Sequence, residues 1–268
     1  MSTLYDKISH HSASQINMAK SCMAAYLVCY GMGIRDDVNP AMVRGRAAEA
    51  AVEYGLAEKN KTAQDVADQA AKQFDAETPR RMSIDESEVE KWQRERDIAQ
   101  RCAVSAFEFI QAQDWGPLTD CQVKCSYNIA GIPKPIVGYT DFTFGESGLV
   151  VDLKCVGRAQ NKPADHHSLQ IAGYAVAQSN YQQALLYAFP KAKTSKDEHA
   201  ARFFKISDET VDEQLRIAAH TCHAMKKLLS LSDSVDEISQ YITPNFDSFY
   251  LTGKVRDAAI GLFSKNYK

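Results

Sequence analysis

The sequence predicts an α/β protein, in which a mixed central β-sheet is flanked by helices and preceded by an N-terminal helical region. Three observations lead to this expectation. Apolar residues recur at helical spacing before about residue 115, three β-rich runs then follow closely on one another, and a helix separates them from a further buried strand. The order β-β-β-α-β, with helices before and after it, is typical of an α/β sandwich with helical additions.

The N-terminal helical part, about residues 1–115, contains four predicted helices. Ser12 and its neighbours cap the first, which is expected to run through 18–30. The other three are expected at 41–56, 62–74 and 86–113, and the last has apolar residues at helical spacing.

The predicted core, about residues 116–206, holds the strands. They are expected at 120–129, 135–144, 149–156, 184–189 and 201–206, with a helix over 164–178. The C-terminal helical part, about 207–268, begins with the last long helix, at 208–229. A chain of this length fits one sizeable core, so we expect a single domain over 1–268.

Composition limits the classes of protein to consider. A content of 45% hydrophobic and 24% charged residues is ordinary for a soluble globular protein. No apolar run approaches the ~20 residues that span a bilayer, and residues 1–7 lack the basic and apolar regions of a signal peptide. We therefore expect no membrane association and a cytoplasmic protein, or one of the host cytoplasm if the chain is viral.

Cysteine usage and charge add two further limits. The seven cysteines include no Cys-x-x-Cys pair, which favours free thiols in a reducing compartment and supplies no zinc or iron–sulfur site. The net charge of −3 gives no global attraction to nucleic acid, although a groove needs only local positive potential to bind it.

A predicted hairpin carries the most informative feature, a pair of aspartates. If its turn is centred on Glu146 and Ser147, antiparallel pairing sets Asp141 opposite Asp152. Like charges in that position destabilise a sheet unless a cation or a shared proton lies between them. Lys154 falls on the same face as Asp152, because side chains alternate along a strand. Two acids and a lysine on one face are typical of a metal-dependent hydrolytic centre.

The helix after these strands carries a second polar pair. Gln170 and Tyr174 are spaced i, i+4, so they share one helical face and can meet a substrate. Two alternatives remain open at this point. Asp-x-Lys occurs by chance as an ion pair on edge strands, and a Gln/Tyr pair can form an ordinary exposed face.

Four short motifs, taken together, resemble the PD-(D/E)xK nuclease superfamily, in particular its RecB-like and phage-exonuclease branch. The motifs span about residues 9–174 and follow one another in the same order as in that family. The third motif has Asp where members of the family more commonly have Glu. The matching segments are Gly45-Arg46-Ala47-Ala48-Glu49, Gly138-Tyr139-Thr140-Asp141, Asp152-Leu153-Lys154 and Gln170-Ile171-Ala172-Gly173-Tyr174. The resemblance implies a restriction-endonuclease-like core.

The resemblance also implies roles for individual residues. The metal ligands would be Asp141, Asp152, the Leu153 backbone carbonyl and Glu49, and Lys154 would orient or activate the attacking water. Hard oxygen ligands suit Mg²⁺ or Mn²⁺. Glu53 is an alternative to Glu49, which could instead pair with Arg46 along the helix. Gln170 and Tyr174 would hold the substrate strand or the water network, and the candidate phosphate contacts are Arg44, Arg46, Arg158 and Lys162.

The function implied is a Mg²⁺-dependent exonuclease that hydrolyses double-stranded DNA from its ends during recombination or DNA processing, as in phages. Such enzymes often form homo-oligomeric rings and work with a single-strand annealing protein. Some relatives carry an iron–sulfur cluster, but segment 243–250 has no cysteine, so we expect no cluster and a buried packing role for Cys22. The alternatives are a CRISPR-adaptation-type nuclease without that cluster, and a non-catalytic DNA-binding or assembly protein that retains the fold.

Overall fold

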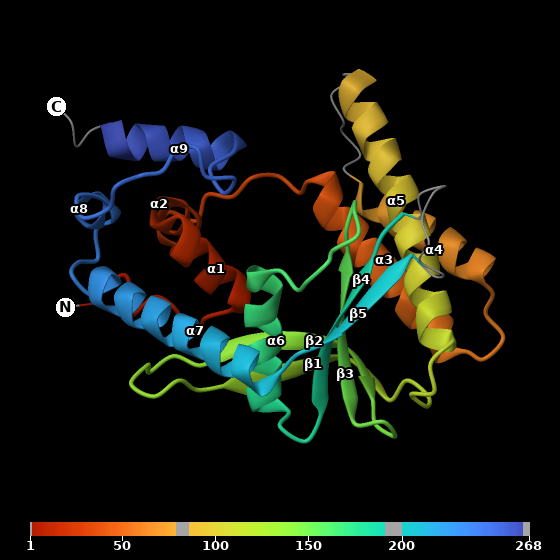
Figure 1. Ribbon diagram of the computed structural model, residues 1–268. Coiled ribbons are helices and arrows are strands. Elements are labelled where there is room, and N and C mark those ends of the chain that lie inside the picture. The colour runs from red at the N-terminus through yellow and green to blue at the C-terminus, as the bar shows by residue number, and fades with distance from the viewer. Residues whose placement is uncertain (1, 79–85, 191–199, 265–268) are drawn as a thin grey trace.

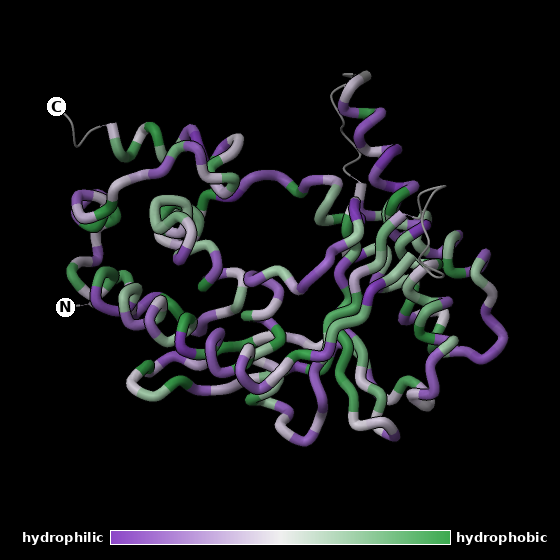
Figure 2. Tube along the Cα trace, viewed as in Figure 1, coloured by the Kyte–Doolittle hydropathy of each residue, from purple (hydrophilic) through white to green (hydrophobic). Residues whose placement is uncertain are grey.

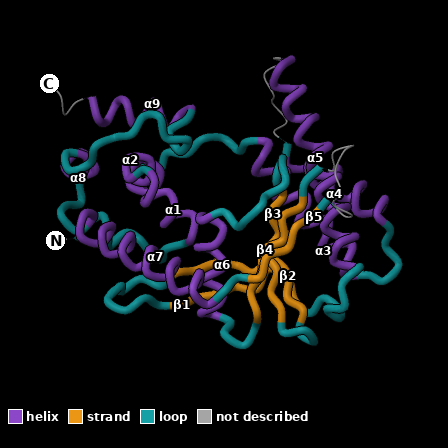
Figure 3. Tube along the Cα trace, viewed as in Figure 1, coloured by secondary structure: helices purple, strands orange, loops and turns teal. Residues whose placement is uncertain are grey.

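A five-stranded mixed β-sheet forms the centre of the computed structural model, which describes residues 2–78, 86–190 and 200–264 (Figures 1 and 3). The strands lie side by side in chain order, and only β3 and β4 run parallel. Their bounds are β1 Asp120–Tyr127, β2 Ile136–Phe144, β3 Leu149–Cys155, β4 Gln182–Ala188 and β5 Ala201–Lys205. The predicted fold class, with helices flanking the sheet, is confirmed.

Three helices from the N-terminal half cover one face of this sheet. Asn39 caps α3 (Pro40–Ala57) by accepting a hydrogen bond from the Met42 amide, and Thr62 forms a capping box at α4 (Ala63–Glu77). Helix α5 (Glu86–Gln111) completes the layer. Small alanines of α3 and α5 let these helices pack closely on Phe142, Phe144 and Leu186 of the sheet.

The opposite face is covered by α6 (Asp165–Ala177), with α1 (Ala13–Ser21) and α7 (Asp208–Leu229) packed against it (Figure 1). Ile171 and Tyr174 of α6 pack on Leu185 and Tyr187 of β4. Because strands β3 and β4 are covered on both faces, they are buried along almost their whole length, and hydrophobic stretches run through the sheet (Figure 2).

The two ends of the chain meet in a separate apolar cluster. It joins α2 (Met23–Tyr26) and the π-helical turn Leu27–Gly31 to α8 (Val235–Ser239) and α9 (Gly253–Phe263). The prediction of one unbroken helix through 18–30 is wrong, since Cys22 is extended (φ −157°, ψ 91°) and separates α1 from α2. The break turns α2 toward the C-terminal helices, and Cys22 itself is buried there, as expected.

Two positions interrupt the regular pairing around β2, and both involve Asp141. The β2–β3 hairpin pairs Phe142 with Val151 and Phe144 with Leu149, which is the predicted register. Asp141 and Asp152 would form the next pair, but the ladder stops before them. Between β1 and β2, the pairs Cys121–Phe142 and Val123–Thr140 flank a gap at Gln122 and Asp141.

Within 2–78, 86–190 and 200–264, every helix is too short or too polar to cross a bilayer.

Candidate active site

The two aspartates are held deep in the sheet on neighbouring strands. Asp141 of β2 is 6% exposed and Asp152 of β3 is fully buried. Where the ladder stops, Asp141 Oδ2 accepts a hydrogen bond of 2.8 Å from the Leu153 amide. Burial raises the pKa of Asp141 well above its usual range, and the charge of Asp152 raises it further. The ladder therefore does not extend to the predicted pair of Asp141 and Asp152. Instead, the Asp141 carboxylate contacts the backbone of Leu153, the residue next to Asp152.

Asp152 is partnered on one side only. The Lys154 ammonium forms an ion pair with its Oδ2, whereas Oδ1 is buried and has no hydrogen-bond partner in the described part of the chain. Burial raises the pKa of Asp152, and Lys154 counteracts this shift. Burial alone would lower the pKa of Lys154, but the charges of Asp152 and Asp141 outweigh it and the pKa is raised. Lys154 is therefore a cation here, and an unpaired buried carboxylate oxygen lies beside it.

A chain of hydrogen bonds from α6 holds Lys154. Its ammonium donates to Gln170 Oε1 at 3.1 Å, and Gln170 Nε2 donates to the Tyr174 hydroxyl at 2.6 Å. That hydroxyl in turn donates to the Tyr139 backbone carbonyl of β2. Gln170 and Tyr174 do share one face, as predicted, but in this structure they position Lys154.

Gly138 makes this arrangement possible. A Cβ added to Gly138 would lie 2.9 Å from Cε1 of the Tyr174 ring, so the ring packs directly over the glycine backbone. This close approach gives a physical reason for the glycine of the Gly-x-x-Asp segment.

Glu49 reaches the site from helix α3, across from the sheet. Its carboxylate accepts a hydrogen bond from the Gln122 side chain, whereas Arg46 pairs with Glu77 at 2.5 Å, so the alternative pairing of Glu49 with Arg46 is wrong. Burial and the charge of Asp152 raise the pKa of Glu49 to about 7. Glu49 lines the cleft beside Asp141, and Glu53 is not among the residues that line it.

Gln122 was missed by the sequence analysis. Its φ of 51° lies in the left-handed region, which is unfavourable for a residue with a β-carbon, and it occupies the gap in the ladder opposite Asp141. The kink directs an exposed amide at Glu49. Non-glycine residues in such strained conformations cluster at functional sites, where surrounding contacts maintain them. Nothing in the local sequence indicates this backbone conformation.

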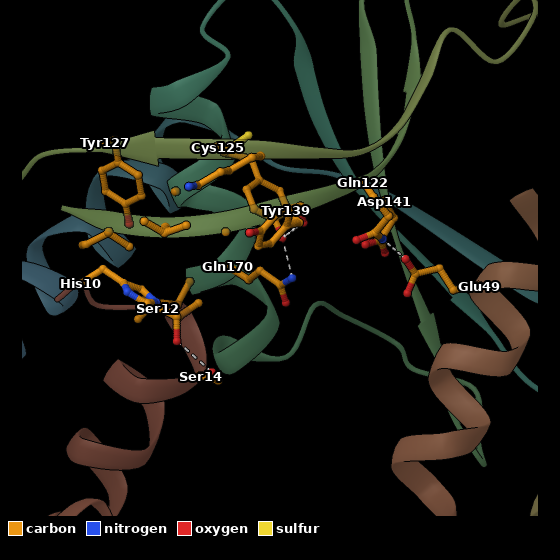
Figure 4. A pocket seen from close by; sticks show the side chains of 18 residues that line it. His10, Ser12, Ser14, Glu49, Gln122, Cys125, Tyr127, Tyr139, Asp141 and Gln170 are labelled. Carbon is orange, nitrogen blue, oxygen red and sulfur yellow. Dashed lines mark hydrogen bonds between the residues drawn. The ribbon is translucent and has the colours of Figure 1, made fainter. Parts of the chain in front are cut away.

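Glu49, Gln122 and Asp141 form one end of a cleft of about 600 Å³ (Figure 4). Glu49 of α3 points toward Asp141 and Gln122 from one side, and Ser12 and Ser14 near α1 lie at the other end. Between them the floor is formed by β1 and β2, including Lys124 and Tyr139, and α6 contributes Gln170 and Tyr174.

Of the predicted phosphate contacts, two form ion pairs within the protein and two are exposed in a loop outside the cleft. The Arg44 guanidinium pairs with Glu95 and donates to the Cys155 carbonyl at 3.1 Å, so it ties α3 to α5 and β3. Arg46 is half exposed but engaged by Glu77. Arg158 and Lys162 are exposed in the loop between β3 and α6, outside the cleft lining. The structure thus gives Arg44 a role in holding the fold.

The donor set fits a hard divalent cation. Asp152 Oδ1 lacks a partner, and the carboxylates of Asp141 and Glu49 face the same end of the cleft. The amide and carbonyl of one strand residue point to the same side, so the Leu153 carbonyl faces the gap beside Asp141. Across the described ranges, no three His, Cys, Asp or Glu side chains are already gathered as a metal site. The hydrogen bond to Gln122 and the ion pair to Lys154 occupy acids that such a cation would contact.

Comparisons with known proteins identify a family. The model of the PD-(D/E)XK nuclease superfamily matches residues 10–236. No curated protein matches the chain. Among solved structures, that of SSO0001 is 14% identical and covers 74% of this chain and 91% of its own, with a TM-score of 0.34. A TM-score this low does not establish that the two chains share a fold.

The contact between Gly138 and Tyr174 can be tested by adding one methyl group. Gly138→Ala places a Cβ 2.9 Å from the Tyr174 ring. We expect the free energy of unfolding, measured in urea, to fall by about 1–3 kcal/mol because the buried ring must shift. Gly157→Ala is the matched control, since a Cβ there has no neighbour within 4 Å in the part of the chain that the structure describes. Equal stability of the two variants would contradict the packing argument.

The raised pKa of Glu49 predicts how stability depends on pH without a divalent cation. The folded protein holds the proton up to about pH 7, whereas an unperturbed glutamate loses it near 4.5. Between these values the folded state binds more protons, so stability falls as pH rises, by up to about 3 kcal/mol. Urea unfolding in chelator at several pH values measures this slope. Glu49→Gln should flatten it, and an unchanged slope in that variant would exclude Glu49 as its source.

Proposed function

The chain belongs to the PD-(D/E)XK nuclease superfamily, and we propose that it is a divalent-metal-dependent deoxyribonuclease. The observation that carries the proposal is the unpaired, buried Asp152 Oδ1, which lies beside Lys154 on the strand next to Asp141, and Asp141 lines the end of a cleft. An arrangement in which buried acids lack partners is costly for a fold, and a cation that joins them offsets this cost. Superfamily members typically use divalent metals.

The ligands for the cation would be Asp141, Asp152, Glu49 and the Leu153 carbonyl. Mg²⁺ and Mn²⁺ both prefer oxygen ligands of this kind. Bound there, the ion would lower the pKa of water and stabilise negative charge on the phosphate.

Lys154 would act on the reacting phosphodiester directly. Its ammonium is fixed between Asp152 and Gln170, so it is aimed without further loss of side-chain freedom. From this position it can orient the attacking water and donate a hydrogen bond to the phosphate oxygen on which charge develops. Gln170 and Tyr174 would serve the reaction as positioning residues for Lys154.

The finer activity that we propose is an exonuclease acting on double-stranded DNA ends in recombination or DNA processing. Its support is the order and spacing of the four motifs, which resemble the phage-exonuclease branch. On the same ground we propose a single-strand annealing protein as partner and a homo-oligomeric ring as the working assembly.

Removing one proposed catalytic group at a time tests the roles assigned to Asp152 and Lys154. Asp152→Asn and Lys154→Met are close in shape to the native residues but lose the charge. We expect cleavage of linear duplex DNA in Mg²⁺ to fall by at least a thousandfold, about 4 kcal/mol of transition-state stabilisation. Circular dichroism should show both variants folded. Asp152→Asn should also lose calorimetric Mn²⁺ binding, whereas Lys154→Met should retain it.

Linear and covalently closed circular DNA distinguish the type of nuclease. Loss of linear DNA alone, in Mg²⁺ and not in chelator, is the result expected of an exonuclease. Cleavage of the circle would instead indicate an endonuclease. If wild-type protein binds DNA but cleaves neither form with any divalent cation, the chain is a DNA-binding member of the superfamily.

A further inference from the structure

The floor of the cleft carries an aromatic and a basic side chain next to the carboxylates. Tyr139 precedes Asp141 by two residues on β2, and Lys124 lies directly opposite Tyr139 on β1. Both line the cleft, and Lys124 is exposed. Tyr139 is 50% exposed, which is unusual for a large aromatic ring on a strand whose next five residues are buried.

The backbone beneath this ring is rigidly held. The Tyr139 carbonyl accepts the hydrogen bond from the Tyr174 hydroxyl, and the Tyr174 ring packs over Gly138. On the other side, Asp141 is tied to the Leu153 amide. A half-exposed ring on a fixed backbone loses little conformational freedom when a ligand covers it.

The chemistry of the pair matches a nucleotide. A base stacks on an aromatic ring in proteins that bind single strands, and a lysine contacts the adjoining phosphate. Inside a duplex, each base is already stacked between its neighbours, and only the terminal pair has a free face. An unpaired nucleotide can therefore cover Tyr139, whereas a base inside a duplex cannot.

From these observations, and resting on the proposed nuclease function, we propose that Tyr139 and Lys124 form a subsite for an unpaired DNA strand. One base would stack on Tyr139, and its phosphate would pair with Lys124. The strand would then continue past Gln122 to the carboxylates. In this arrangement the end of a duplex has to fray before its phosphodiester reaches Asp141 and Asp152.

Binding measured without cleavage tests the subsite. The probe is a fluorescently labelled single-stranded oligonucleotide, titrated by anisotropy against Asp152→Asn protein in low salt. Adding Tyr139→Ala should weaken binding about 5- to 150-fold, the usual range for one stacked base. Tyr139→Phe should bind like the parent, since the ring is retained. Tyr241→Ala is the matched control, because Tyr241 is 69% exposed and outside the cleft lining.

Lys124→Ala should also weaken binding, and it should reduce the slope of log K against log salt by about 0.7, as expected for one lost phosphate contact on a single strand. Equal binding by Tyr139→Ala and Tyr241→Ala would overturn the subsite. If Tyr139→Ala and Lys124→Ala weaken binding of a capped duplex, which has no free ends, as much as binding of the single strand, the subsite is not restricted to unpaired strands. If the Asp152→Asn parent binds no DNA at all, the proposed function itself fails.

A different observation carries a second inference, on helix α3. Gly45 is in the interior of this helix, where glycine is unfavourable, and a Cβ added there would have no neighbour within 4 Å among residues 2–78, 86–190 and 200–264. Packing within these described ranges therefore does not explain the glycine. Gly45 lies one turn before Glu49, and residues four apart share a helical face. We infer that the sugar–phosphate backbone of the substrate passes close to α3 at Gly45, where a side chain would obstruct it.

Gly261 of α9 provides the matched control, since it is also helical and open. Gly45→Ala and Gly261→Ala should each raise the melting temperature, because alanine favours the helix. Gly45→Ala, and more strongly Gly45→Leu, should weaken oligonucleotide binding by tenfold or more, whereas Gly261→Ala and Gly261→Leu should not. Wild-type affinity in Gly45→Leu would overturn this inference, and a failure of wild-type protein to bind would refute the proposed function.

Discussion

The burial of two carboxylates on adjacent strands is the constraint on which the rest of this structure depends. Asp141 and Asp152 are almost completely removed from water, and each raises the energy of the other in its charged form. The sheet accommodates them by ending the β2–β3 ladder one pair early and binding Asp141 to the Leu153 amide. Lys154 then neutralises one side of Asp152, and the other oxygen, Oδ1, has no hydrogen-bond partner among the described residues.

Several features farther away keep this charge cluster in place. Tyr174 packs over Gly138 and supports Gln170, which holds Lys154. On the other side, Arg44 ties helix α3 to α5 and to the end of β3. Because Arg44 and Glu49 belong to the same helix, this clamp also fixes how far Glu49 reaches toward the sheet. An arginine that resembles a phosphate contact in the sequence thus helps to position Glu49.

The sequence predicts those parts of the site that depend on local periodicity. The hairpin register follows from the glycine-bounded turn, and the contact between Gln170 and Tyr174 follows from helical spacing. The break at Cys22 is not predictable in this way, because residues 23–27 are helical in pattern and are turned by packing on α8 and α9. Gln122 is equally hidden, since its left-handed backbone arises from facing Asp141 across the sheet.

The strained backbone at Gln122 and the unpaired oxygen of Asp152 have a common physical meaning. Each costs free energy in the folded protein, and neither improves the packing of the core. Gln122 lines the cleft and donates to Glu49, and Asp152, which is not part of the cleft lining, raises the pKa of Glu49 through its charge. The residues that would hold a divalent cation there are Asp152, Asp141 and Glu49, and the cation would supply the positive charge that this group of acids lacks. The groups that make this part of the fold costly are therefore the ones whose chemistry suits a hard cation, so the stability of the site and its proposed chemistry depend on the same residues.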